Sequence, residues 1–168
     1  MNSKMKIKGF IAYKLLDENG NVKVEGKTEN IVTHQGLKYY VDRLSDQGGS
    51  VVQLMVLGTG TTAVGTADTW VGGYFADNGT IAGTAGSAAI TTNSGTPTNL
   101  QYMGTYSAGY ATQNGITRVG LANMVASADG NGTPNGTTTF FIAHGTLDPT
   151  VNKGASDTLV ITWNHIFS

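Results

Sequence analysis

The residues of this chain that are best suited to bind a metal are its three histidines, His34, His144 and His165. A zinc motif usually brings two such imidazoles within about three to five residues of each other, often beside cysteines. No spacing of this kind occurs here, and the chain contains no cysteine. The spacing favours three separate imidazoles over a metal site, and convergence of the three in space is the alternative.

A hydrolase would need a nucleophile, a base and an acid in one place. His144 and Asp148 could form such a set with a serine. The Gly-x-Ser-x-Gly elbow that exposes a nucleophilic serine is not found in the sequence. Because serine and aspartate are frequent in loops, pairs of this kind arise by chance. We therefore expect a protein that is not an enzyme.

Two turn sequences superficially match ligand-binding loops. Residues 58–63, Gly-Thr-Gly-Thr-Thr-Ala, follow an apolar run as a phosphate loop does, but they lack its lysine, and no helical pattern follows. Asp17-x-Asn19-x-Asn21 begins like a calcium loop, without the glycine at its sixth position or the distal glutamate. Turns explain both segments better. We expect no cofactor and no metal.

Aromatic residues point to recognition instead. Tyr102, Tyr106 and Tyr110 recur every four residues, which places them on one face of a strand. Such a face suits core or subunit packing, which we favour, or stacking against a sugar. Trp70 lies in a glycine-rich loop, and large aromatic side chains are frequent anchors at interfaces. The predicted aromatic interface residues are Trp70, Tyr74, Phe75, Tyr102, Tyr106 and Tyr110.

Composition narrows the class of protein. Only 12% of the 168 residues are charged and the formal net charge is −1, whereas about a quarter is usual. Glycine, threonine and other small or β-branched residues dominate, which favours strands joined by long turns. The charge argues against a nucleic-acid partner, and no apolar run is long enough for a membrane span. We expect a soluble protein made without export.

Basic residues gather near the beginning of the chain. Eight of the ten lie between Lys4 and Arg43, so that the first fifty residues carry +2 and the others −3. This distribution suits an amino-terminal section that lies on an acidic partner. We therefore predict that Lys4, Lys6 and Lys8 also contribute to an interface.

A few strands and one helix must position these residues. We predict a single β-rich domain over 1–168: an N-terminal hairpin arm and strand over 1–33, a short helix over 34–46, and a main sandwich over 51–168. Its low-complexity insert covers 77–99 and is either a long loop or a pair of weak strands, such as one over 86–92. The hairpin turns at Asn19-Gly20, with a further strand-like run at residues 30–32. Thr33 is the predicted N-cap, and the helical spacing is carried by Leu37, Tyr40, Val41 and Leu44.

Further strands are predicted over 51–57, 100–111, 116–121, 138–143 and 158–167. The expected fold is mainly β: an antiparallel β-sandwich, jelly-roll or immunoglobulin-like, with one short α-helix and long Gly/Thr-rich loops. At about three turns, the helix needs tertiary packing, and we expect it to cap one end of the sheet.

Several short segments occur in an order that resembles a group of small virion structural proteins of tailed bacteriophages. They are 29–33 (Glu-Asn-Ile-Val-Thr) with Gly36-Leu37, 54–63 (Leu-Met-Val-Leu-Gly-Thr-Gly-Thr-Thr-Ala), 67–69 (Ala-Asp-Thr), 116–121 (Ile-Thr-Arg-Val-Gly-Leu) and 157–163 (Asp-Thr-Leu-Val-Ile-Thr-Trp). The resemblance covers roughly residues 29–167. Arg118 departs from it, since related chains often carry Glu there, and the insert is not part of the shared pattern.

The resemblance implies a structural protein of the virion that forms a homo-oligomer, with a trimer favoured. The first role it implies is a capsid decoration (cement) protein that stabilises the head by binding the major capsid protein. The alternative is a tail or fibre component whose aromatic residues contact neighbouring tail proteins or a host glycan receptor. We favour decoration because fibre proteins are usually longer and carry repeats. A lectin-like module is a hypothesis from another class.

Overall fold

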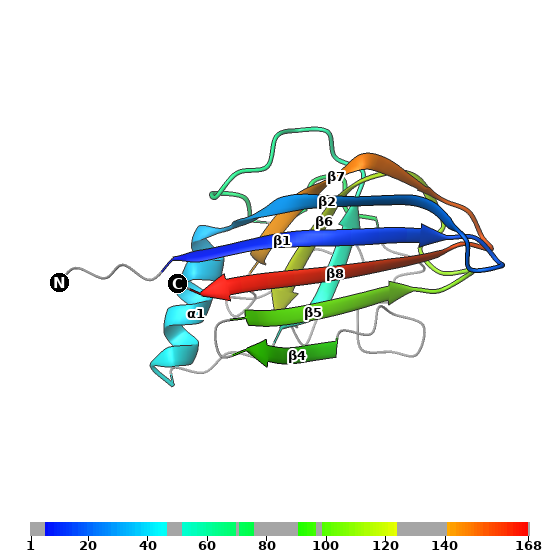
Figure 1. Cartoon of the computed structure of the whole chain (residues 1–168). Coiled ribbons are helices and arrows are strands. Elements are labelled where there is room, and N and C mark those ends of the chain that lie inside the picture. The colour runs from blue at the N-terminus through cyan, green and yellow to red at the C-terminus, as the bar shows by residue number, and fades with distance from the viewer. Residues whose placement is uncertain are drawn as a thin grey trace.

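The structure is a computed structural model that describes residues 6–46, 52–69, 71–75, 91–96, 99–123 and 141–167. Within these residues the chain forms eight strands and one helix (Figure 1). The strands are β1 (Ile7–Leu16), β2 (Val22–Val32), β3 (Val52–Gly58), β4 (Thr91–Thr96), β5 (Asn99–Tyr106), β6 (Gln113–Asn123), β7 (Phe141–Lys153) and β8 (Thr158–Phe167). The helix is α1 (His34–Leu44). The predicted mainly β class is confirmed.

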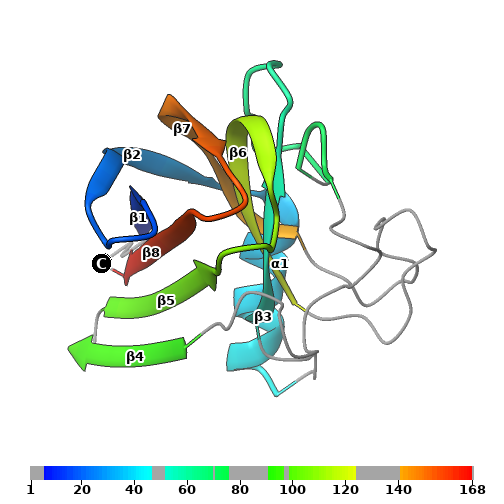
Figure 2. The same ribbon diagram turned by 90° about the vertical axis from the view of Figure 1, so that its right-hand side faces the viewer.

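All eight strands belong to one antiparallel sheet, in the order β3-β6-β7-β2-β1-β8-β5-β4. The sheet bends at β2, which pairs with β1 over most of its length and with β7 through residues 30–32. Figure 2 shows how the bend brings β3 round towards β5. The hydroxyl of Tyr106 on β5 donates a 2.6 Å hydrogen bond to the carbonyl of Met55 on β3. One sheet thus encloses a core between its two halves.

The predicted amino-terminal hairpin is present, and its turn is fixed by a carboxylate. Asp17 Oδ1 accepts 2.8 Å hydrogen bonds from the backbone N–H groups of Asn19 and Asn21. Gly20 has φ +82°, a conformation that glycine adopts without strain. The structure corrects one detail, because β2 is a single strand up to Val32 where the sequence indicated two runs.

The core is filled by alternate residues of the central strands. On β8, Leu159, Ile161 and Trp163 are fully buried, and on β1 Ile11, Tyr13 and Leu15 are at most 1% exposed. This is the period of two that a strand imposes on its side chains. Residues of the opposite parity on β1, β8 and β5 form the outer face of the sheet.

The helix closes one end of the sheet, as predicted. Thr33 is its N-cap, since the Thr33 hydroxyl accepts a 2.9 Å hydrogen bond from the N–H of Gly36. Gly36 then packs directly on β7: a Cβ at this position would lie 2.0 Å from the carbonyl oxygen of Ile142. The two contacts fix the rotation of α1 about its axis and turn Tyr39 and Tyr40 inwards, where both are buried.

Several predicted segments differ in extent from the structure. The strand expected over 100–111 is β5, which ends at Tyr106, and the strand expected over 116–121 is β6, which covers Gln113–Asn123. The strand expected over 138–143 is β7, which runs from Phe141 to Lys153 through Gly145, Asp148 and Pro149. Glycine, aspartate and proline are depleted in strands, which explains why the sequence pattern did not predict the part of β7 after residue 143. In the expected insert over 77–99, β4 occupies Thr91–Thr96 and β5 begins at Asn99; residues 77–90 and 97–98 lie outside the described residues. No helix of the described part has the length and apolar character of a membrane span.

Candidate functional site

The three histidines occupy separate places in the fold. His34 is exposed at the start of α1, His144 is buried on β7, and His165 is fully buried on β8. Within the described ranges, no group of three or more His, Asp or Glu side chains is arranged to hold a metal ion. The imidazoles must therefore be considered one at a time.

His165 lies at the centre of a buried polar cluster beneath α1. Its Nε2 accepts a 3.1 Å hydrogen bond from the indole N–H of Trp163 and lies 3.0 Å from the amide nitrogen of Asn30. Because Nε2 accepts, Nδ1 carries the hydrogen and donates to the hydroxyl of Tyr40 at 2.5 Å. Burial lowers the pKa of His165 to about 4. A neutral imidazole thus joins the sheet to the helix.

The cluster continues into β5 through the tyrosines. Burial, together with the nearby Tyr102 hydroxyl, raises the pKa of Tyr40, and burial also raises the pKa of Tyr102. Both hydroxyls therefore stay protonated at all ordinary pH values, and the Tyr40 hydroxyl is in a hydrogen bond with that of Tyr102. The arrangement is suited to holding α1 in place. It supplies no nucleophile and no free base.

A second buried polar cluster fixes the segment 59–69 against β6 and β7. Arg118 Nη1 donates a 2.6 Å hydrogen bond to the hydroxyl of Thr146, and Nη2 donates to the carbonyl of Thr62. His144 Nε2 lies 2.9 Å from the carbonyl oxygen of Gly65 and 3.4 Å from a carboxylate oxygen of Asp68. Burial lowers the pKa of His144, against the opposing effects of these two oxygens. Arg118 therefore anchors the segment 59–69 to the sheet.

The predicted aromatic platform does not form on the surface. Tyr102 and Tyr106 share one face of β5 as expected, but that face is the core, and each side chain is only 3% exposed. Tyr110 lies beyond the strand, half-buried, with its ring stacked on Tyr106 at a centroid distance of 6.3 Å. Tyr102 and Tyr106 are therefore packing residues within the protomer, because the inward parity of β5 selects them.

The other predicted interface residues are only partly accessible. Tyr74 packs against a small apolar cluster on the outer side of β3, and Phe75 against the main core. Both are half-buried. Trp70 and Lys4 lie outside the described residues. Lys6 and Lys8 are exposed at the start of β1, on the end of the molecule where α1 lies.

The structure exposes an apolar surface that the sequence pattern had placed inside. Leu37, Val41 and Leu44 are 46%, 56% and 76% exposed. They follow one another at intervals of four and three residues and form a single stripe along α1. We name Leu37, Val41 and Leu44 the helix stripe. Of the four residues that gave the helical spacing, only Tyr40 faces the core, because the Thr33 cap and the Gly36 contact set the rotation of the helix.

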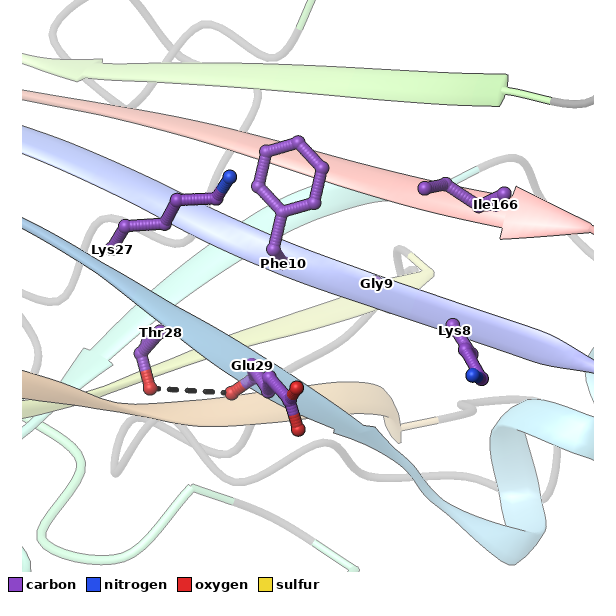
Figure 3. A pocket seen from close by; sticks show the side chains of 7 residues that line it. All are labelled: Lys8, Gly9, Phe10, Lys27, Thr28, Glu29 and Ile166. Carbon is purple, nitrogen blue, oxygen red and sulfur yellow. Dashed lines mark hydrogen bonds between the residues drawn. The ribbon is translucent and has the colours of Figure 1, made fainter.

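A pocket of about 410 Å³ lies on the outer face of the sheet near the same end (Figure 3). The pocket forms where β2 separates from β1. The last pair between these strands is Phe10 with Glu29, and from Asn30 onwards β2 pairs with β7. We name this place the fork pocket. Its lining residues are Lys8, Gly9, Phe10, Lys27, Thr28, Glu29 and Ile166.

The fork pocket combines apolar and cationic groups. Lys27 Nζ lies 4.0 Å from the centroid of the Phe10 ring, which is a cation–π contact. Ile166 is 40% exposed across from Lys8, its paired residue on β1. In the described part of the chain, no carboxylate lies within ion-pair distance of Lys8 or Lys27. Lys8 was predicted from its charge, but nothing in the sequence showed where β2 changes partner.

Comparison of the chain with family models, with curated proteins and with solved structures gave no significant match.

Proposed function

We propose that the chain is a non-enzymatic structural protein of a tailed-phage virion, namely a capsid decoration (cement) protein that stabilises the head by binding the major capsid protein. One observation carries this proposal. The helix stripe leaves three large apolar side chains of α1 in water, while the opposite side of the same helix is already buried against the core.

A helix with apolar residues on both sides is normally covered on both sides. Burial of apolar surface contributes roughly 25 cal/mol per Å², and interface cores are depleted in charge. The stripe is flanked by Lys38 and Asp42, which bind each other as an i,i+4 ion pair. The flanking charges are thus already compensated, which suits a surface that packs against another protein.

Three polar side chains of the two buried clusters also support an assembly role. His165, Tyr40 and Arg118 are engaged in hydrogen bonds that position α1 and the segment 59–69. We further propose that the bent sheet is a sandwich of the jelly-roll or immunoglobulin-like kind, with the Gly/Thr-rich segments as loops. Virion location and a homo-oligomer, with a trimer favoured, belong to the same proposal.

The direct test is quantitative mass spectrometry of purified virions, which gives the copies of this chain per copy of the major capsid protein. We expect a ratio set by the capsid lattice. A ratio far below it would assign the chain to the tail or fibres, and absence from the particle would refute any virion role.

The role of the helix stripe is tested with paired substitutions. Val41→Glu is expected to lower the copies bound per head at least tenfold, because it places a charge in the stripe. Val22→Glu is the matched control: Val22 is 49% exposed at the hairpin end of β2, far from α1 in Figure 1. Equal occupancy of heads by the two variants, both folded by circular dichroism, would contradict docking through the stripe.

A further inference from the structure

We propose that the fork pocket binds an extended, acidic segment of polypeptide that belongs to the protein partner. The inference rests on the proposed function in one respect, since it takes the major capsid protein as that partner. It concerns a different surface from the helix stripe and names the chemistry that the second contact recognises.

Within the described residues, the start of β1 has an unpaired edge inside the fork. Residues Ile7–Gly9 pair with β8 on one side, Ile7 with Phe167 and Gly9 with His165. On the other side no described strand pairs with them, because β2 has already turned to β7; the side chain of Asn30 lies against Gly9, so the edge is open at Ile7 and Lys8. In an antiparallel strand, alternate N–H and C=O groups point to each side. The edge can therefore accept a short added strand.

The fork pocket is also positively charged. Two lysines and one glutamate line the pocket, so that it carries a net charge of +1, and all three are exposed. Figure 3 shows Lys8 and Lys27 on opposite sides of Phe10 along β1, with Glu29 at the rim on β2. An acidic side chain of the added strand would lie next to Lys8. Because β2 occupies the edge of β1 from Phe10 onwards, the segment would then leave the sheet edge, and a second acidic side chain would meet the Lys27 ammonium group over the Phe10 ring. Side-chain contacts of this kind provide specificity when a strand is added to a sheet edge.

Between the two lysines the pocket has an apolar floor. Phe10 and Ile166 give the pocket a surface on which an aliphatic side chain or the stem of a glutamate can lie. Lys27 already covers one face of the Phe10 ring, at 4.0 Å. The ring is thus partly occupied for the flat stacking that a sugar requires, which favours a peptide over a glycan.

The test uses isotope-labelled protein and a synthetic probe, the ten-residue peptide acetyl-(Glu-Thr)₅-amide, with its Lys-Thr counterpart as charge control. We expect saturable amide shifts confined to Ile7–Phe10 and Lys27–Glu29 with the acidic peptide only. The double variant Lys8→Gln, Lys27→Gln is expected to weaken binding at least tenfold. Glu29→Gln is expected to strengthen it about threefold, since it removes the one repulsive charge.

Lys14→Gln is the matched control, because Lys14 lies on the same outer face but pairs with Glu25 at 3.5 Å, outside the pocket. It is expected to bind the peptide as the native chain does. Shifts that are scattered, or that are equal for both peptides or for the double variant, would overturn the proposal. Binding of a hyaluronan tetrasaccharide without binding of the acidic peptide would assign the pocket to glycans instead. Because the test uses the isolated protein, it is independent of the virion measurement.

Discussion

Lowering the pH from 7 to 4 is expected to reduce the free energy of unfolding by about 3 kcal/mol through His165 alone. His165 is fully buried and neutral, with both ring nitrogens engaged by Trp163 and Tyr40. Its pKa in the folded protein is about 4, against an ordinary value of 6.5. Protonation would add a charge to the core and remove the acceptor that the indole uses.

Stability is lost at low pH because the imidazole takes up its proton at a higher pH in the unfolded chain than in the folded chain. In the unfolded chain the imidazole is protonated below about pH 6.5, and in the folded chain only below about 4. The stabilising contribution is therefore fully present above pH 6.5 and is lost as the pH falls towards 4. At about 1.4 kcal/mol for each pH unit, this interval corresponds to about 3 kcal/mol.

The measurement is urea unfolding followed by tryptophan fluorescence at intervals between pH 7 and pH 4. The His165→Gln variant keeps one acceptor and one donor but has no titrating group, so its slope in this range is expected to be smaller. His144, whose pKa burial also lowers, and the carboxylates act in both proteins and cancel in the difference. His34→Gln, at an exposed position, is the control and is expected to follow the native chain.

The two proteins are compared by the slope of the free energy of unfolding against pH. A lower stability of the His165→Gln variant at every pH therefore does not affect the result. The reasoning is refuted if the native chain and this variant lose the same free energy between pH 6.5 and 4. It is equally refuted if direct titration of the His165 ring by NMR places its pKa near the ordinary value.

Three further substitutions test packing, hydrogen bonding and loop anchoring. A glycine-to-alanine substitution usually stabilises a helix, but in Gly36→Ala the new methyl group would lie 2.0 Å from a backbone carbonyl oxygen of β7. We expect the free energy of unfolding, measured in urea, to fall by about 2 kcal/mol or more. An increase would contradict the contact. Tyr106→Phe leaves the buried carbonyl of Met55 without its donor, and calorimetry should show a loss of about 1–3 kcal/mol. Arg118→Gln removes the guanidinium that holds Thr62, so limited proteolysis should cut the segment 59–69 at least several-fold faster while circular dichroism stays native. Unchanged cleavage would show that other contacts hold this segment.

The sequence predicted those parts of the fold that depend on local chemistry. Asn19-Gly20 marked the hairpin because a turn needs such residues, and Thr33 marked the helix start because its hydroxyl can cap free N–H groups. The alternation on β8 predicted its strand because one face had to be apolar. In each case the cause lies within a few residues of the effect.

The parts that were missed depend on contacts between distant segments. Leu37, Val41 and Leu44 have the helical spacing of a buried face, yet the contact of Gly36 with β7 turns them outwards. The fork pocket arises because β2 leaves β1 for β7, a choice that no local pattern records. The candidate site therefore needed the tertiary structure, apart from the charge of Lys8.

The pairing of β1 with β8 has a consequence for engineering this chain. Because Ile7 is paired with Phe167, the two strand ends leave the molecule side by side, next to α1 (Figure 1). A fluorescent protein or affinity tag fused close to Ile7 or Phe167 would lie beside α1, where it would obstruct the docking that we propose for the helix stripe. The hairpin turn at 17–21 lies at the far end of the same strands. A cargo inserted there would point away from the helix stripe.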